Sequence, residues 1–135
     1  MDAPLSGQGR GLMELASIAI FGAAGCLARY FVSGWTYEVL GRWLPYGTLA
    51  VNILGSFLLG LIMEGSLRST LFPPAIRIGL TVGFMGGFTT FSTFSYETYR
   101  LLEDGSLLQA GANVLLNLLV CLVGVWLGIG FARQL

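Results

Sequence analysis

The chain has 135 residues, of which 55% are hydrophobic and only 10% are charged, and its mean hydropathy is +0.77. Seven arginines balance seven acidic residues and there is no lysine or histidine, which excludes a basic nucleic-acid surface and a histidine-ligated metal site. These values predict an integral membrane protein of the all-α class, because helices satisfy their own backbone hydrogen bonds in lipid.

Turn signals divide the sequence into four apolar segments. A helix needs about 20 apolar residues to cross the hydrocarbon core of a bilayer. We expect such helices over residues 13–34, 47–64, 75–99 and 107–131. The connections are too short for a soluble domain, so residues 1–135 form a single four-helix membrane domain.

The first expected helix carries Arg29 two-thirds of the way along its length. A charged side chain at this depth is costly, so it either pairs, faces water or anchors the end of the helix at the interface. Cys26 lies in the same apolar run, where a small hydrophobic residue is a commoner role than a disulfide or a metal ligand.

The second expected helix carries Asn52, with Thr48 one turn earlier on the same face. A hydrogen bond to another helix is the modest interpretation of Asn52, and contact with a ligand is the more specific one. Gly55 and Gly60 on this helix allow a close helix contact, either within one subunit or between two.

The third expected helix contains the stretch MGGFTTFSTFSYE. Gly86 and Gly87 cost about 1 kcal/mol each relative to alanine in a helix, and the hydroxyls that follow compete for backbone groups. We therefore expect the helix to break between Met85 and Thr90. Freed carbonyl and hydroxyl oxygens suit a hard cation such as Na⁺, and a new helix N-terminus suits an anion.

Two aromatic residues and a carboxylate follow this expected break. Phe91 and Phe94 lie three residues apart and share a face of the helix. Such residues usually belong to a core, but the positive edges of two rings can also attract a small anion without holding it too tightly for conduction. Glu97 follows near the membrane surface, where it either orients a polar neighbour or is a plain interfacial carboxylate.

The fourth expected helix has a polar stripe, because Asn113, Asn117 and Cys121 recur at every fourth residue. Buried amides at this spacing either join helices or supply N–H donors along the path of an anion, and the sequence slightly favours the first role. Gly124 and Gly128 on the same helix allow close helix packing.

Three stretches resemble the small bacterial fluoride channels of the Fluc/CrcB family. They are GCLARY (25–30), GTLAVNILGSFLLG (47–60) and TVGFMGGFTTFSTFSYE (81–97), in the order and spacing of the family. The resemblance implies an antiparallel, dual-topology homodimer among the lipids of the bacterial cytoplasmic (inner) membrane. It further implies two fluoride pores, each built from both subunits, a central structural Na⁺, and passive export of fluoride without enzymatic activity.

The resemblance also assigns roles to individual residues by motif position. Gly86 and Thr89 would give carbonyl oxygens to Na⁺, Phe91 and Phe94 would contact fluoride, and Asn52 would donate a hydrogen bond to it. The polar lining would further comprise Ser92, Thr93, Glu97 and Asn117, with Arg29 near a vestibule. Family members often carry a hydroxyl or an aromatic residue where this chain has its asparagine stripe.

Two other classes of function compete with a channel. A small proton-coupled exporter would need a carboxylate at membrane depth, whereas Glu14, Glu64 and Glu97 lie near helix ends. A non-transporting membrane assembly subunit would explain the packing but not a central break. Arginines fall on both predicted sides of the membrane, so the chain either inserts in both orientations or has a single, weakly specified one.

Overall fold

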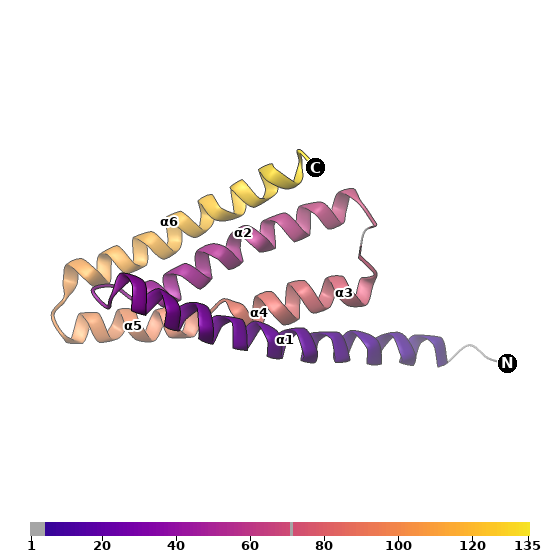
Figure 1. Cartoon of the computed structure of the whole chain (residues 1–135), viewed down its shortest axis with the longest axis horizontal. Helices are drawn as coiled ribbons and strands as arrows, with labels where there is room; N and C mark the ends of the chain where they lie inside the picture. The colour runs from indigo at the N-terminus through magenta and orange to yellow at the C-terminus, as the bar shows by residue number, and fades with distance from the viewer. Residues whose placement is uncertain (1–4, 71) are drawn as a thin grey trace.

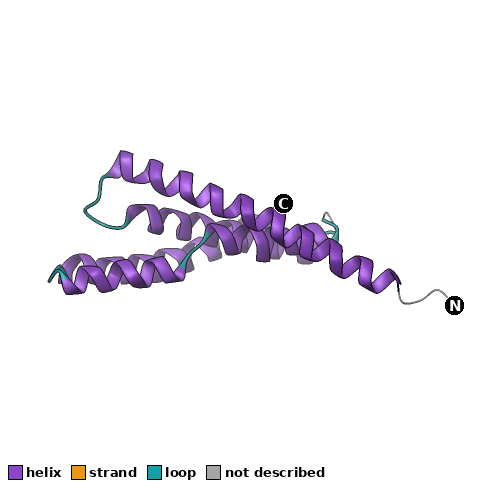
Figure 2. Ribbon diagram, turned by 90° about the horizontal axis from the view of Figure 1, so that it is seen from below, coloured by secondary structure: helices purple, strands orange, loops and turns teal. Residues whose placement is uncertain are grey.

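The computed structural model describes residues 5–70 and 72–135, and helices form nearly all of this part of the chain (Figure 1 and Figure 2). In chain order they are α1 (Leu5–Leu40), α2 (Tyr46–Arg68), α3 (Pro74–Ile78), the π-helical η1 (Gly79–Phe84), α4 (Met85–Phe88), α5 (Phe91–Glu103) and α6 (Leu107–Ala132). No strand occurs among the described residues, so the predicted all-α class is confirmed.

Within the described residues, three helices are long and apolar enough to cross a membrane. They are Gln8–Leu40 of α1, Tyr46–Arg68 and Leu107–Ala132, with mean hydropathies of 1.7, 1.7 and 2.4. Large apolar side chains on these helices, such as Leu27 and Trp126, are exposed, as expected where lipid is the solvent. The chain is therefore a multi-pass membrane protein.

The first helix is longer than the predicted range 13–34. Gly34 lies inside α1, because one glycine costs too little to end a long helix. The helix continues to Leu40 and stops at Gly41, whose φ of 77° is the left-handed conformation that commonly follows a helix C-terminus. The second helix also extends past its predicted end, to Arg68, whereas α6 agrees with its predicted range to within one residue.

The third segment breaks as predicted, but the break is shorter than the expected range 85–90. Gly86 and Gly87 are helical and belong to α4. Only Thr89 (φ −88°, ψ 161°) and Thr90 (φ −154°, ψ 117°) have extended backbone. The prediction that the glycines unwind the helix is therefore wrong, and the hydroxyl residues that follow them form the break.

The glycines of this segment instead allow α1 to pack closely against η1 and α4, beside which it runs (Figure 1). A Cβ atom on Gly87 would lie 2.5 Å from the carbonyl oxygen of Gly22, and one on Gly83 would lie 2.7 Å from the carbonyl oxygen of Ile18. Both distances are shorter than van der Waals contact. Glycine is therefore required at both positions by the approach of two backbones.

Helices α2 and α6 pack side by side along their length (Figure 1). A Cβ atom on Gly60 would lie 2.6 Å from the carbonyl oxygen of Val125, and one on Gly124 would lie 3.2 Å from that of Ile53. The small residues noted in the sequence therefore serve packing within one chain. This packing brings the asparagines of α6 against α2 and positions the site described next.

Candidate functional site

The centre of the site is the two-residue break between α4 and α5, which is capped on both sides. At the end of α4, the backbone N–H and the hydroxyl of Thr89 both donate to the carbonyl oxygen of Met85, at 3.0 and 2.9 Å. At the start of α5, the hydroxyl oxygen of Thr90 accepts a hydrogen bond from the Thr93 backbone N–H at 3.2 Å. These caps stabilise the two helix ends and therefore the break between them.

The break deprives the carbonyl groups of residues 86–89 of their helical donors, among them those of Gly86 and Thr89. In a continuous α-helix the N–H of Thr90 would bond to Gly86 and that of Thr93 to Thr89. Instead, Thr90 donates to Asn52 Oδ1 at 2.8 Å, and Thr93 donates to the Thr90 side chain. The carbonyl oxygens of Gly86 and Thr89 thus lose the donors that a helix gives them, and such oxygens are suitable ligands for a monovalent cation.

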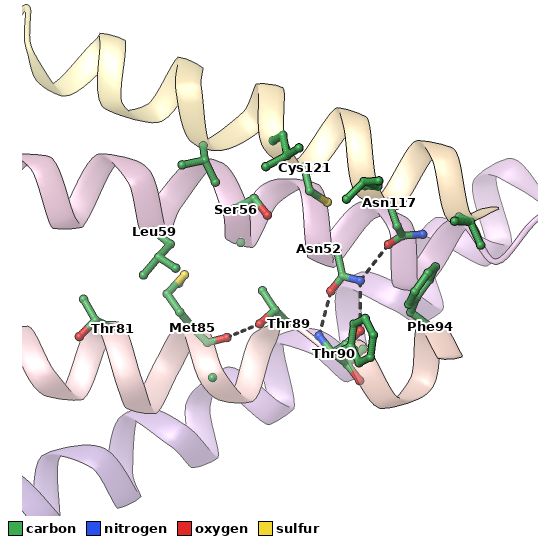
Figure 3. A pocket seen from close by; sticks show the side chains of 17 residues that line it. Asn52, Ser56, Leu59, Thr81, Met85, Thr89, Thr90, Phe94, Asn117 and Cys121 are labelled. Atoms are coloured by element: carbon green, nitrogen blue, oxygen red, sulfur yellow. Dashed lines mark hydrogen bonds between the residues drawn. The ribbon is translucent and has the colours of Figure 1, made fainter. Parts of the chain in front are cut away.

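Asn52 pairs with the extended backbone of Thr90 as a neighbouring strand would (Figure 3). It accepts the Thr90 N–H, and its Nδ2 group donates to the Thr90 carbonyl oxygen at 3.1 Å. The same Nδ2 group donates to Asn117 Oδ1 at 2.9 Å. The predicted hydrogen bond from Asn52 to another helix is therefore confirmed, and both N–H groups of its amide are used within the chain.

The asparagine stripe of α6 continues this network. Asn117 Nδ2 donates to the carbonyl oxygen and to Oδ1 of Asn113, at 3.0 and 3.1 Å. Asn113, which is only 1% exposed, donates to the Thr98 hydroxyl oxygen at 2.9 Å. The stripe joins α6 to α2 and α5, which is the role that the sequence slightly favoured. Cys121, one turn further on, is not part of this network and faces Ser56.

A cavity of about 680 Å³ lies beside the break (Figure 3). Its polar end is formed by Asn52, Thr89, Thr90 and Asn117, and the rest of its lining is mainly apolar. Phe91 and Phe94 both line it, with ring centroids 5.5 Å apart and ring planes at 50°. Phe91 is 78% exposed, so this pair does not belong to a closed core of the single chain.

Glu97 lies apart from this cavity, in a smaller hollow of about 250 Å³. Its Oε1 atom accepts hydrogen bonds from the Thr48 hydroxyl at 2.9 Å and the Tyr37 hydroxyl at 3.2 Å. Its Oε2 atom is buried and has no hydrogen-bond partner among the described residues. Arg42, whose guanidinium lies over the Tyr37 ring, and Arg100 line the same hollow.

Besides Glu97, three other predicted lining residues do not reach the large cavity. Ser92 and Thr93 are exposed, and within the described part of the chain they line neither the large nor the small cavity. Their hydroxyl oxygens lie 3.4 and 3.0 Å from that of Thr90. Arg29 is half-buried on α1, and it takes part in none of the ion pairs found among the described residues.

Sequence reasoning gave no role to two of the groups that complete these networks. Tyr37 lies beyond the predicted end of the first helix at residue 34, and Thr98 lies beyond the hydroxyl cluster. Their partners, Glu97 and Asn113, lie on other helices 60 and 15 residues away along the chain. Helical periodicity relates only residues within one helix, so it could not pair them.

The fold and the site define a small multi-pass membrane protein in which a broken helix brings backbone oxygens, amides and aromatic rings to one cavity. The family model described as "CrcB-like protein, Camphor Resistance (CrcB)" matches residues 16–129. The chain therefore belongs to the CrcB family, as the resemblance of its motifs predicts.

Several relatives share nearly the whole length of the chain, and each is named a fluoride-specific ion channel, FluC. The protein of Syntrophotalea carbinolica is 68% identical over 123 residues, which cover 91% of this chain and 100% of the relative. That of Geotalea daltonii is 68% identical over 118 residues (87% and 95%), and that of Geobacter metallireducens is 62% identical over 124 residues (92% and 100%). Their names confirm that the family is one of channels and not of enzymes.

Proposed function

We propose that the chain is a fluoride-selective channel that gives passive export of fluoride across the bacterial cytoplasmic membrane. The observation that carries this proposal is the meeting of amides, hydroxyls and aromatic rings at the broken helix, in a chain that is 62–68% identical to proteins named fluoride channels. Fluoride is strongly hydrated, so a path for it must replace water with hydrogen-bond donors, and a narrow path of this kind rejects larger chloride.

The proposed assembly is an antiparallel homodimer. In each chain the segment from Pro74 to Glu103, third in chain order, crosses the membrane in addition to the three long apolar helices. Gly86 and Phe91 are exposed beside the polar break, and carbonyl groups without partners are costly in lipid, so a second copy must cover them. The part of this segment before the break (74–88) and the 13 residues of α5 are similar in length. Two inverted copies would therefore bring their breaks to the same depth.

The cation proposed at the centre of this dimer is Na⁺, held by the carbonyl oxygens of Gly86 and Thr89. Two copies of the break would offer four such oxygens, and neutral oxygen ligands of this kind suit a hard monovalent ion. Gly86 is exposed, and outside its own stretch of helix no described atom lies within 4 Å of a Cβ built on it, so there is room for a partner to approach. When bound, the ion would supply positive charge beside the anion path and hold the two breaks together.

Each of the two proposed pores would carry fluoride past Asn52 and the edges of Phe91 and Phe94. Because both N–H groups of Asn52 are already used, a passing fluoride would take over the one that now donates to the Thr90 carbonyl oxygen. Asn117 would keep its bond to Asn52 meanwhile. The remaining predicted lining residues, Ser92, Thr93, Glu97 and Arg29, would belong to the path on either side of this point.

The test is fluoride efflux from liposomes that contain the purified protein, with and without Na⁺. We expect rapid efflux of fluoride, no comparable efflux of chloride, and loss of activity when Na⁺ is removed. Fluoride efflux no faster than from empty liposomes would refute the channel. Efflux that requires a proton gradient would favour the exporter.

The aromatic contribution is tested by Phe91→Ile and Phe94→Ile, which keep an apolar side chain but remove the ring edge. We expect fluoride efflux to fall at least tenfold while the dimer survives in detergent. Phe131→Ile, on an exposed ring of α6 outside the cavity, is the matched control and should behave as the wild type does. Efflux equal to that of the wild type in all three variants would show that the aromatic rings do not contribute to the path.

A further inference from the structure

A chain of hydrogen bonds leaves the break just before α5 and crosses to α2 and α6. It begins at the backbone N–H of Thr90, which donates to Asn52 Oδ1 at 2.8 Å. The Nδ2 group of Asn52 donates to Asn117 Oδ1 at 2.9 Å, and the Nδ2 group of Asn117 donates to Asn113 Oδ1 at 3.1 Å. Each amide thus accepts from one neighbour and donates to the next.

The same chain then returns to α5, the helix that follows its starting point. Asn113 Nδ2 donates to the hydroxyl oxygen of Thr98 at 2.9 Å. The Thr98 hydroxyl donates to the carbonyl oxygen of Phe94 at 2.7 Å. The chain therefore starts at the main-chain N–H of the residue that caps α5 and ends at a main-chain carbonyl group of α5, four residues further along.

The two ends give the chain a fixed direction, because a backbone N–H can only donate and a carbonyl oxygen can only accept. If the Asn113 amide were reversed, its NH₂ group would face the NH₂ group of Asn117. Its oxygen would face the Thr98 hydroxyl, which would have to give up Phe94 to bond with it. Only one orientation of all three amides completes the chain, and hydrogen bonds in such a series strengthen one another in a medium of low dielectric constant.

The geometry points to Asn113 and Thr98 as positioning residues for the proposed cation site. They fix the orientation in which Asn52 draws the Thr90 N–H away from Gly86, and so they keep the break open. Neither residue lines the large or the small cavity in the described part of the chain, so they act through Asn52. The cation in this inference comes from the proposed function, whereas the hydrogen bonds that support the inference do not depend on it.

The test is a matched pair of variants at Thr98. Thr98→Val keeps the shape of the side chain and removes the hydroxyl, whereas Thr98→Ser keeps the hydroxyl and removes a methyl group. The first measurement is the Na⁺ concentration that gives half-maximal fluoride efflux from liposomes. Loss of one hydrogen bond in a membrane protein should raise this concentration about 3-fold to about 20-fold in Thr98→Val. Thr98→Ser should match the wild type.

The second measurement needs no transport. Hydrogen exchange of the Asn52 side-chain amide, followed by NMR in detergent, should be slow in the wild type and in Thr98→Ser, and at least threefold faster in Thr98→Val. Equal exchange and equal Na⁺ requirement in the two variants would overturn the inference, as would an effect of Thr98→Ser alone, which would indicate packing. If the wild type carried no fluoride, the proposed function would fail and the exchange comparison would still decide the positioning role.

Discussion

Replacing Asn52 by aspartate keeps the size of the side chain but changes its charge and removes its hydrogen-bond donors. The new carboxylate can still accept the Thr90 N–H that Asn52 Oδ1 accepts at 2.8 Å, so its direct hydrogen bond to the break is kept. It cannot donate to the Thr90 carbonyl oxygen or to Asn117, and it adds a negative charge at the polar end of the cavity. If the dimer persists, a loss of activity therefore reports on the site beside Asn52 and not on unfolding.

The charge should outweigh the lost hydrogen bonds. The two bonds are worth about 0.6 kcal/mol each on the average measured in membrane proteins. A carboxylate and a fluoride about 3 Å apart repel each other by about 5 kcal/mol at an effective dielectric constant of about 20. That energy corresponds to a decrease of about 1,000-fold or more in the occupancy of the site by fluoride. We therefore expect Asn52→Asp to abolish measurable efflux.

The assay is fluoride efflux from liposomes, with size-exclusion chromatography in detergent as the check that the dimer persists. Ser106→Asp is the matched control, because it adds the same charge at the N-cap of α6, where aspartate is a favoured residue, and outside the cavity. We expect the control to retain efflux. An Asn52→Asp protein with the dimer intact and efflux within twofold of the wild type would refute the placement of the anion path beside Asn52.

Two further predictions concern the helices that frame the site. Gly87→Ala should lower the free energy of unfolding by about 1–3 kcal/mol, because its Cβ atom would lie 2.5 Å from the carbonyl oxygen of Gly22. Outside its own stretch of helix, no described atom lies within 4 Å of a Cβ on Gly111, so Gly111→Ala should leave stability unchanged or raise it. Thermal unfolding in detergent compares the two variants, and equal stability would contradict the close packing at Gly87. Thr90→Val should cost about 1 kcal/mol through loss of the cap to Thr93, whereas Thr90→Ser keeps it, as denaturant unfolding would reveal. A valine variant as stable as the serine variant would argue against the cap.

The sequence was sufficient for the helical class, for the interruption of the third segment and for the packing role of the asparagine stripe. These features depend on local composition and on the spacing of residues along one helix, which are both visible in a single sequence. The glycine pair was misinterpreted because a helical propensity describes an isolated helix. In the folded chain, the contact of Gly87 with α1 outweighs the small cost of glycine in a helix.

The parts of the site that sequence reasoning missed are contacts between helices. Nothing local pairs Asn113 with Thr98, or Glu97 with Tyr37, since those contacts depend on how α1, α5 and α6 pack. For the same reason, Glu97 could not be separated beforehand from the residues at the large cavity. The roles of the lining residues toward fluoride, and of Gly86 and Thr89 toward Na⁺, stay predictions for the experiments above.

The polar end of the large cavity consists of Asn52, Thr89, Thr90 and Asn117. Amides, hydroxyls and peptide groups neither gain nor lose protons over the range of acidity that a living cell experiences. The charge of these four residues therefore stays constant when the cytoplasm acidifies. At this point of the path, ions would respond to their concentration gradient and to the membrane voltage, and not to a change of charge in the lining.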